Sequence, residues 1–543
     1  MKKLWLLTII IFLIYFHPWN KDFPLPVYNT KESFNKTFSN YFYYSSEIKR
    51  GNLPFWNPLV ANGSTFLAQT DYSLFNPLTL IVLRFLPFPL NLKILYLISF
   101  LIASTGMFLF LKSLKQKGNA FAGTCIFVFF GPFLSMVSDL NVLQTLSLVP
   151  WIFLLVNKSL ALGGLVIALQ VLSGPFELTL LTLFFVLIYY RSIRVIWTMI
   201  AGLCLSSIKL ITFFDISSLT IAPLQYFYVA STNINSIRFF YPSIVTIISV
   251  FFIRKNVIYL FLVIFCLLMA FPAISPLYIL YLTPPFFWIN RPEIFLSFAG
   301  FFLGAIVSIN WRRLFIIILF IELIVFNFLN LPKETAGQIM VSLEKKYPFI
   351  NKIQKEKAKI WFNDSVLSTQ IEPLEPNNNL LWGITSLNSY EPGTKRHQTY
   401  LSLLNPSANR LLSIQSVKYQ VNPFKSINNP LPEVYTANKI TLVKTTEQLI
   451  DLLLDKKFSP EKESLVEEKL RSTKITIVTQ SYSKLFKNVV PVNLDQQGMV
   501  GDRKSSLDLQ SLKIGITITL ISLIFLILLN FSRWQLFFHH KSG

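Results

Sequence analysis

Carboxylates and arginines stand at the ends of apolar runs along this sequence. The set comprises Asp22, Glu32, Asp71, Asp139, Glu177, Asp215, Arg238, Arg291 and Glu293. A carboxylate can take a proton from a hydroxyl group, and an arginine can bind a phosphate through two parallel hydrogen bonds. A single charge of this kind is usually a solvated loop residue. Ionisable groups held at membrane depth, however, usually face a cavity, so the set predicts a polar site.

A second candidate is the segment from Gly51 to Pro77, which is rich in Pro, Gly and Asn. These residues fix turns. Trp56 and Asn57 lie near its start, and the aromatic residues Phe66, Tyr72 and Phe75 follow. The aromatic surface suits sugars or lipid tails. The alternative is a rigid interfacial loop that caps a helical bundle.

Several kinds of chemistry have no support in the sequence. There is no phosphate-binding G-x-x-x-x-G-K-[ST] motif and no G-x-G-x-x-G motif, so nucleotide chemistry is not indicated. The four histidines and three cysteines form no set with metal-ligand spacing, so no metal site is predicted from them. No histidine stands near a nucleophile-elbow turn.

Composition identifies the environment of these residues. Of the 543 residues, 53% are hydrophobic and 14% are charged, and the mean hydropathy is +0.52. An ordinary soluble chain carries about 25% charged residues, so we expect a polytopic all-α membrane protein. The formal charge of +22 could indicate nucleic acid, but many basic residues sit in short loops between apolar runs. There they orient helices, and no nucleic acid is expected as a partner.

The apolar runs predict about 12 transmembrane helices, the first uncleaved and the run 160–190 broken at Gly174-Pro175. Lysines and arginines recur in alternate connections, which places both termini in the cytoplasm of a multi-pass protein of the inner membrane. The long first loop 17–91 and residues 332–513 then lie outside. Residues 77–89 and 276–292 are too short or too proline-rich to span and are expected at the interface or re-entrant.

Three regions follow from this pattern. Residues 1–331 form a transmembrane module, and residues 514–543 form the last helix with a basic cytoplasmic tail. Residues 332–513 are rich in Asn, Lys, Glu and Ser and alternate short β-type and helical runs. We expect them to form an extracytoplasmic mixed α/β domain before the last helix.

The order of several short motifs resembles the YfhO-like bacterial membrane proteins, relatives of the GT-C glycosyltransferases. The matching positions are Gly51, Leu53, Pro54, Trp56, Asn57 and Pro58, then Gly63, Phe75, Pro77, Val149-Pro-Trp151, Gln170 to Gly174, Arg291-Pro292, Pro376-Asn377, Gly383, Asn388-Ser-Tyr390, Ser416 to Tyr419 and Pro491 to Leu494. The family usually carries an Asp about two dozen residues before its Trp-Asn-Pro. This chain has Glu32 there and Asp22 further upstream.

The resemblance implies transfer of a sugar from a polyprenyl-phosphate-linked donor to a cell-envelope glycan or lipid on the outer face. Glu32, with Asp22 as second choice, would be the catalytic base. Arg291 and Arg238 would stabilise the leaving phosphate, and Trp56, Asn57, Asp71, Asp139 and Glu177 would contact substrate. A divalent cation, with Asp71 or Asp139 as ligands, is a further candidate. Two alternatives stay open, namely a lipid-linked glycan transporter or flippase and a non-catalytic scaffold of envelope assembly.

Overall fold

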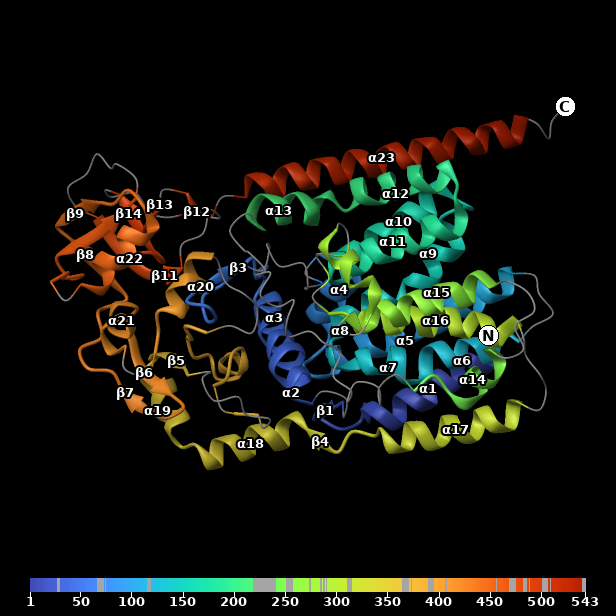
Figure 1. Cartoon of the computed structure of the whole chain (residues 1–543), viewed down its shortest axis with the longest axis horizontal. Coiled ribbons are helices and arrows are strands. Elements are labelled where there is room, and N and C mark those ends of the chain that lie inside the picture. Colours follow the sequence, from blue (N-terminus) through green and yellow to red (C-terminus); the bar gives the residue numbers. More distant parts are fainter. Residues whose placement is uncertain are drawn as a thin grey trace.

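The structure is a computed structural model with a helical part and a strand-rich domain (Figure 1). It describes residues 1–26, 30–65, 73, 75–114, 119–217, 241–250, 257–272, 275–283, 286, 289, 291–309, 315–363, 371–372, 374–388, 395–405, 408–455, 457–467, 475–481, 486–487, 489–500, 506–507 and 509–539.

The helical part contains the apolar runs of the sequence. Its elements are α1 (Lys2–Phe16), α5 (Leu90–Ser113), α6 (Ala120–Phe129), α7 (Gly131–Leu134), the 3-10 turn η3 (Ser135–Ser138), α8 (Leu140–Ser147), α9 (Val149–Leu155), α10 (Leu160–Ser173), α11 (Phe176–Tyr190), α12 (Ile193–Leu205), α13 (Ser207–Ser217), α14 (Ile244–Val250), α15 (Val257–Ala270), the 3-10 segment η7 (Pro276–Leu282), α16 (Ile294–Ile309), α17 (Phe315–Leu329) and α23 (Gln510–His539).

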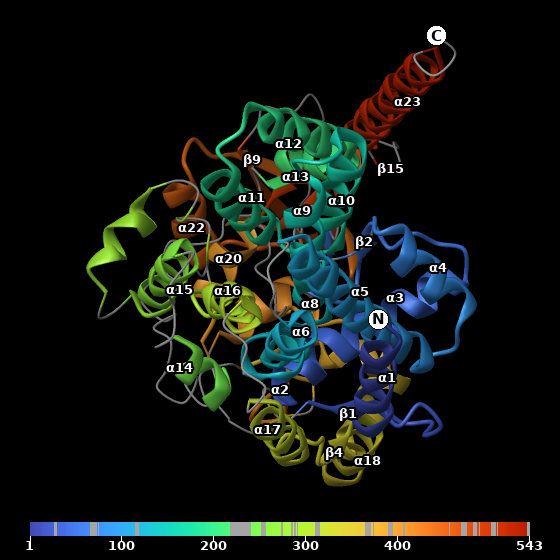
Figure 2. The ribbon, with the colours of Figure 1, turned by 90° about the vertical axis from the view of Figure 1, so that its right-hand side faces the viewer.

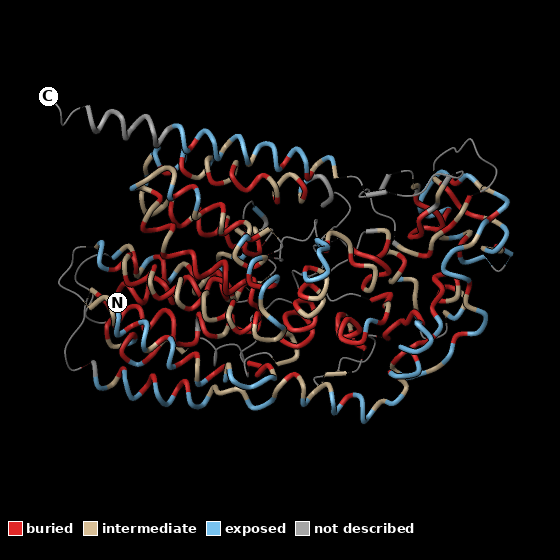
Figure 3. Tube along the Cα trace, turned by 180° about the vertical axis from the view of Figure 1, so that it is seen from behind, coloured by how far each residue is buried: buried red, intermediate tan, exposed pale blue. Residues whose placement is uncertain are grey.

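Aromatic rings fill the centre of this bundle. Phe110 on α5 stacks on Phe301 of α16 with ring centroids 5.2 Å apart, and Phe153 on α9 lies 4.9 Å from the same ring. Gly123 and Gly304 let α6 and α16 approach closely, because a Cβ on either glycine would overlap the carbonyl oxygen of the other. In contrast, α17 and α23 carry many exposed residues (Figure 3). Apolar residues such as Ile324 and Phe525 are among them, as in lipid-facing helices.

Among the described residues, α5 and the Gln510–Leu528 part of α23 are each long and apolar enough to cross a membrane. The pair α12 and α13 meets the same test but is bent by 73°. The prediction of about 12 spans is therefore not confirmed. The apolar runs 120–137 and 195–213 are not continuous helices, because they are interrupted at Phe130 and at Ser206. The Ser206 hydroxyl donates back to Gly202 O, a bond that favours bending.

The helices run between two distinct ends. Trp5 Nε1 donates to Thr105 Oγ1 at 2.9 Å, and Lys93 Nζ donates to His17 O at 3.1 Å, so α1 and α5 are antiparallel. The start of α1 and the end of α23 lie at the end opposite the strand-rich domain (Figures 1 and 2). This arrangement agrees with termini on one side, although which side is cytoplasmic stays a prediction.

The first loop, 17–91, is more structured than its polar sequence suggested. It contains β1 (Pro24–Leu25), α2 (Thr30–Glu32), the π-helix η2 (Ser33–Phe38), α3 (Ser39–Lys49), β2 (Trp56–Asn57), β3 (Ser64–Thr65) and α4 (Pro77–Phe85). All six residues of η2 are buried. Residues 77–89 begin as α4, which exposes Ile81 and Phe85, and η7 occupies the first part of 276–292.

The strand-rich domain covers residues 334–507. Its elements are β4 (Glu334–Thr335), α18 (Ala336–Lys346), α19 (Phe349–Lys355), β5 (Lys359–Phe362), η9 (Asn378–Trp382), α20 (Lys395–Ser402), α21 (Asn409–Ile414), β6 (Val417–Val421), β7 (Lys425–Ser426), β8 (Val434–Ala437), β9 (Lys439–Leu442), α22 (Thr446–Leu454), β10 (Glu463–Val466), β11 (Ile475–Ser481), β12 (Phe486–Lys487), β13 (Val489–Val492), β14 (Gln496–Val500) and β15 (Ser506–Leu507). A six-stranded sheet has the order β8-β11-β14-β13-β10-β9, and β5-β6-β7 form a smaller one.

The first loop docks on this domain through backbone hydrogen bonds. Asn62 N donates to Ser386 O at 3.0 Å, and Ser386 N donates to Leu59 O at 2.8 Å. The buried Lys359 Nζ donates to Asn62 Oδ1 at 2.7 Å and to Thr479 Oγ1 at 3.1 Å. The loop after Trp56 is thus held by the strand-rich domain and does not project into solvent.

Candidate functional site

Five ionisable residues from three separate segments meet where the helices face the strand-rich domain. Glu32 and Lys36 come from α2 and η2, Asp139 precedes α8, and Arg291 and Glu293 precede α16. We call these five residues the charged cluster. Three of them, Glu32, Asp139 and Arg291, were predicted site residues, and the structure brings these three together.

Asp139 lies at the centre of the cluster. Its Oδ2 is 2.7 Å from Lys36 Nζ and 3.3 Å from Arg291 Nη1. The side chains of Lys36 and Asp139 are only 4% and 2% exposed. Burial by itself raises the pKa of Asp139, but Lys36 and Arg291 outweigh it and hold that pKa below its ordinary value. Asp139 is therefore a buried anion at neutral pH.

Glu32 and Glu293 complete the cluster around Arg291. Arg291 Nη2 pairs with Glu32 Oε1, and their side chains are 28% and 12% exposed. Burial raises the pKa of Glu293, whereas Arg291 opposes that rise. The guanidinium is a planar fork that suits carboxylates and phosphates. In both of its ion pairs Arg291 is the more exposed partner, so a ligand from outside could reach it.

Local backbone structure positions these groups. Asp139 caps α8, since its Oδ1 accepts hydrogen bonds from Asn141 N at 3.2 Å and Val142 N at 3.4 Å. Thr37 Oγ1 donates to Ser138 O at 2.8 Å, which ties η2 to the start of α8. Lys36 lies within the π-helix, a geometry that recurs at functional sites because it re-aims side chains.

The strand-rich domain also contacts the helix that carries the cluster. Glu375 Oε1 lies 2.6 Å from Lys31 Nζ, and Glu375 Oε2 accepts from Asn35 Nδ2 at 3.0 Å. Ser39 Oγ donates to Asn378 Oδ1 at 3.4 Å. One face of the α2–η2–α3 helix therefore belongs to the cluster and another to the strand-rich domain.

Asp22 has a different environment from Glu32. Its Oδ1 accepts from Gly337 N at 2.8 Å, and its Oδ2 accepts from Thr335 Oγ1. These contacts place a carboxylate at the N-terminus of α18, where an anion stabilises the helix. Asp22 thus fastens the first loop to the strand-rich domain.

The remaining predicted residues lie elsewhere. Asn57 is buried, and the Trp56 ring packs so closely against Gly63 that it leaves no room for a side chain there. The φ of +102° at Gly63 also favours glycine. Glu177 lies half-buried in the first turn of α11. Arg238 and Asp71 lie outside the described residues, and so does the side chain of Asp215.

Sequence reasoning missed Lys36. It sits in Ser33-Phe-Asn-Lys-Thr-Phe38, a polar–aromatic stretch of a long loop where a lysine usually faces solvent. A signal was available, because the spacing from Glu32 to Lys36 is four residues, so both share one helical face.

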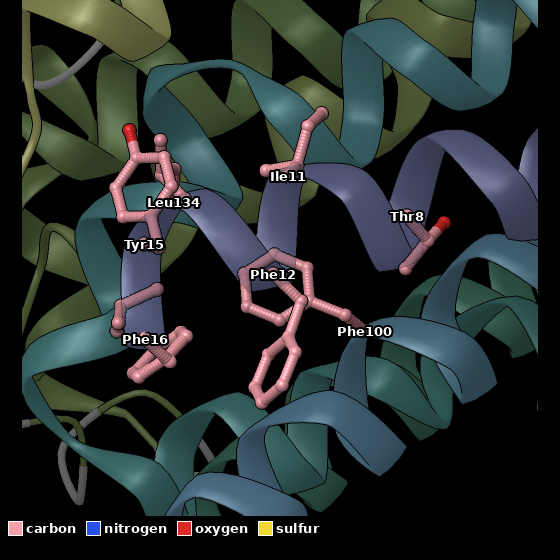
Figure 4. A pocket seen from close by; sticks show the side chains of 8 residues that line it. Thr8, Ile11, Phe12, Tyr15, Phe16, Phe100 and Leu134 are labelled. Carbon is pink, nitrogen blue, oxygen red and sulfur yellow. The ribbon is translucent and has the colours of Figure 1, made fainter. Parts of the chain in front are cut away.

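An apolar pocket lies beside the cluster but carries no chemistry. It is lined by Thr8, Ile11, Phe12, Tyr15, Phe16, Phe100, Leu134 and Val137 (Figure 4). The two hydroxyl groups donate inside the protein, Thr8 Oγ1 to Leu4 O and Tyr15 OH to Asn327 O. It is a packing gap between α1, α5 and the turn that leads to Asp139.

The described residues contain no group of three or more His, Cys, Asp or Glu that could hold a metal ion. The carboxylates of Glu32 and Asp139 converge on Arg291 and not on each other. The divalent cation considered above stays a prediction, since one of its two candidate ligands, Asp71, lies outside the described residues.

No family model matches this chain, and no curated protein matches it. Among solved structures, it is similar to a mutant form of the arabinofuranosyltransferase AftD from Mycobacteria, with 14% identity, a TM-score of 0.50 and 81% of this chain covered. Another AftD structure gives 14% identity and a TM-score of 0.44. The match covers 39% and 37% of the two AftD chains. The chain therefore has a GT-C-like fold, whereas membership of the YfhO-like family stays a prediction.

Proposed function

We propose that this chain is a membrane glycosyltransferase of the GT-C type. In this proposal it transfers a sugar from a polyprenyl-phosphate donor to an envelope acceptor on the outer face of the membrane. The GT-C-like fold and the apolar helices support the class of enzyme. The donor, the acceptor and the inner-membrane location are parts of the proposal.

The observation that carries the proposal is Arg291 between Glu32 and Asp139. The three residues are far apart in the sequence and come from a loop helix, the start of α8 and the start of α16. Their meeting point lies at the helix ends that face the strand-rich domain. A lipid-linked phosphate at headgroup level and an acceptor from outside would both reach such a position.

The reaction assigns a role to each group. Glu32 takes the proton of the acceptor hydroxyl, and the acceptor oxygen forms a bond to the anomeric carbon of the sugar. The bond from that carbon to the phosphate oxygen breaks, and polyprenyl phosphate leaves. Arg291 binds the phosphate and stabilises the charge that develops on its oxygen. Lys36 balances the charge of Asp139, so that less of the positive charge of Arg291 is neutralised by Asp139 and more is available to the phosphate.

Phosphate binding can be tested without knowing the sugar. Purified protein in nanodiscs is titrated with undecaprenyl phosphate and with undecaprenol, which lacks the phosphate. We expect Arg291→Gln to weaken undecaprenyl phosphate binding by about tenfold or more, the worth of a charge-assisted hydrogen bond, and to leave undecaprenol binding unchanged.

The matched control is Arg50→Gln, which removes an exposed arginine paired with Glu47 on α3. Equal binding of undecaprenyl phosphate by the wild type, Arg291→Gln and Arg50→Gln would contradict the proposed role of Arg291. The transporter and scaffold alternatives would then regain weight.

A further inference from the structure

A surface of stacked aromatic rings and lysines lies on the strand-rich domain, apart from the charged cluster. Phe349 on α19 stacks on Phe424 with centroids 4.3 Å apart and ring planes within 6°. The other face of Phe424 stacks on Tyr419 of β6 at 5.2 Å, and Tyr347 packs edge-on against Phe349 at 5.7 Å. These four rings and the lysines around them form what we call the lysine–aromatic patch.

Three lysines lie over these rings. Lys346 Nζ lies 5.0 Å from the centroid of Tyr347, while Lys352 Nζ and Lys418 Nζ lie 5.4 and 5.8 Å from the centroid of Tyr419. Lys355 lies three residues after Lys352 on α19, which places both on one face of that helix, and Lys357 follows in the chain. All five lysines are exposed.

The rings leave little face for stacking on a sugar. Phe424 lies between two rings, and Tyr419 has Phe424 and two ammonium groups around it. Stacking on these rings leaves less of each ring face for a sugar. The exposed ammonium groups favour an anion over a neutral sugar.

The described carboxylates near the patch are already hydrogen-bonded. Glu356 pairs with Lys418 at 2.5 Å and accepts from Tyr419 OH at 2.8 Å. Glu372 accepts from Tyr347 OH at 2.9 Å. These contacts occupy the carboxylates of Glu356 and Glu372, and the lysines of the patch outnumber these two carboxylates.

The position of the patch favours a polymer over the membrane surface. It lies beyond α18, which follows α17 in the chain and leads away from the helical part (Figure 1). The 11 residues of α18 span about 16 Å at roughly 1.5 Å per residue. Lys346 stands at the far end of α18, so the length of this helix separates the patch from α17.

One segment joins the patch to the charged cluster. Glu372 contacts Tyr347 of the patch, and Glu375 contacts Lys31 and Asn35 of the cluster helix. The segment that carries Glu372 and Glu375 therefore contacts both the patch and the cluster helix.

We propose that the lysine–aromatic patch binds an anionic polymer, a chain that carries repeating carboxylates or phosphates. Binding by itself does not depend on the proposed transferase function. The use of the patch to hold an acceptor polymer for sugar transfer does rest on that function.

The test is binding of fluorescent polygalacturonate by the full chain in phosphatidylcholine nanodiscs, with neutral dextran of equal length as comparison. We expect binding of polygalacturonate that weakens with salt and no binding of dextran. Replacing Lys346, Lys352 and Lys355 with Gln together should weaken it by about tenfold, the size that three exposed ion pairs supply.

The control replaces three exposed lysines near β9, β10 and α22 of the same domain, Lys444, Lys457 and Lys462, with Gln. Absence of salt-dependent binding by the wild type, or equal losses in the two triple variants, would overturn the proposal.

Lysine footprinting separates polymer from lipid. Polygalacturonate should protect Lys346, Lys352 and Lys355, whereas protection by phosphatidylglycerol discs without polymer would mean that the patch faces lipid and that the proposal is wrong.

Discussion

A lysine buried as deeply as Lys36 keeps its charge only when a partner compensates for lost water, and Asp139 is that partner. Replacing Lys36 with Met removes one of the cations that pair with the buried carboxylate of Asp139. We expect the free energy of unfolding to fall by about 3–5 kcal/mol, as when one member of a buried ion pair is removed. Denaturation of the purified protein in detergent measures this change.

The double variant Lys36→Met, Asp139→Asn is the control for that loss. It removes both charges, so its destabilisation should be smaller than the sum of the two single effects. If the effects of the single variants simply add, Lys36 and Asp139 do not stabilise each other as their geometry indicates.

The buried Lys359 should make the stability of the strand-rich domain depend on pH. Burial lowers the pKa of Lys359 to about 8, whereas its ordinary value is about 10.5. Between these values the unfolded chain binds the proton and the folded chain does not. Stability should therefore rise with pH across this range, by about 3 kcal/mol in total.

The Lys359→Met variant isolates this contribution from other titrating groups. Unfolding followed at pH 7.5 and pH 10 should show a larger gain for the wild type than for the variant. A gain of equal size in both proteins would mean that Lys359 is not the titrating group.

At the scale of single elements, Gly174 sets the junction between α10 and α11. A Cβ at this position would overlap Asn141 O and Thr145 Oγ1 of α8. We expect Gly174→Ala to destabilise the protein by about 1–3 kcal/mol, the usual effect of overpacking. A thermal-unfolding assay by detergent-solubilised fluorescence measures it.

Gly164→Ala, on the same helix, is the matched control because its Cβ would make ordinary contacts of 3.4 Å with Ala201 and Gly202. It should leave stability nearly unchanged. Equal unfolding temperatures for the two variants would show that the close approach at Gly174 has no energetic effect.

The sequence predicted some elements better than others, for physical reasons. Gly174-Pro175 interrupts one apolar run and was recognised, because proline removes a backbone donor. The 73° bend between α12 and α13 was missed, since hydropathy does not register a bend. The helix 30–49 was also missed. Its polar residues contact other polar groups of the protein, and rings such as Phe38 pack on rings of the protein such as Phe23 and not on lipid.

The same contrast holds for the site. Glu32, Asp139 and Arg291 could be chosen as ionisable residues at helix ends. Their meeting in one cluster with Lys36 depends on contacts between segments that are distant in the sequence. The pair of residues 32 and 291 is such a contact, and no local sequence pattern encodes it.

At the scale of the whole molecule, the arrangement of termini predicts topology. A reporter fused after residue 192 should read cytoplasmic, and one fused at residue 420 should read external, because the alternating lysines and arginines orient the helices. Alkaline phosphatase and green fluorescent protein fusions measure the two locations. A cytoplasmic reading at residue 420 would place the strand-rich domain and the charged cluster on the wrong side for an outer-face enzyme.

The most direct test of sugar transfer by the charged cluster is envelope glycan analysis of a deletion strain complemented with variants. We expect the wild type to restore a glycan that the deletion loses and Glu32→Gln not to restore it, since loss of a general base lowers rates by about 10²–10⁴. Asp22→Asn should restore it, because Asp22 contacts α18 and not the cluster. Full restoration by Glu32→Gln, at equal protein levels in the membrane, would contradict the account.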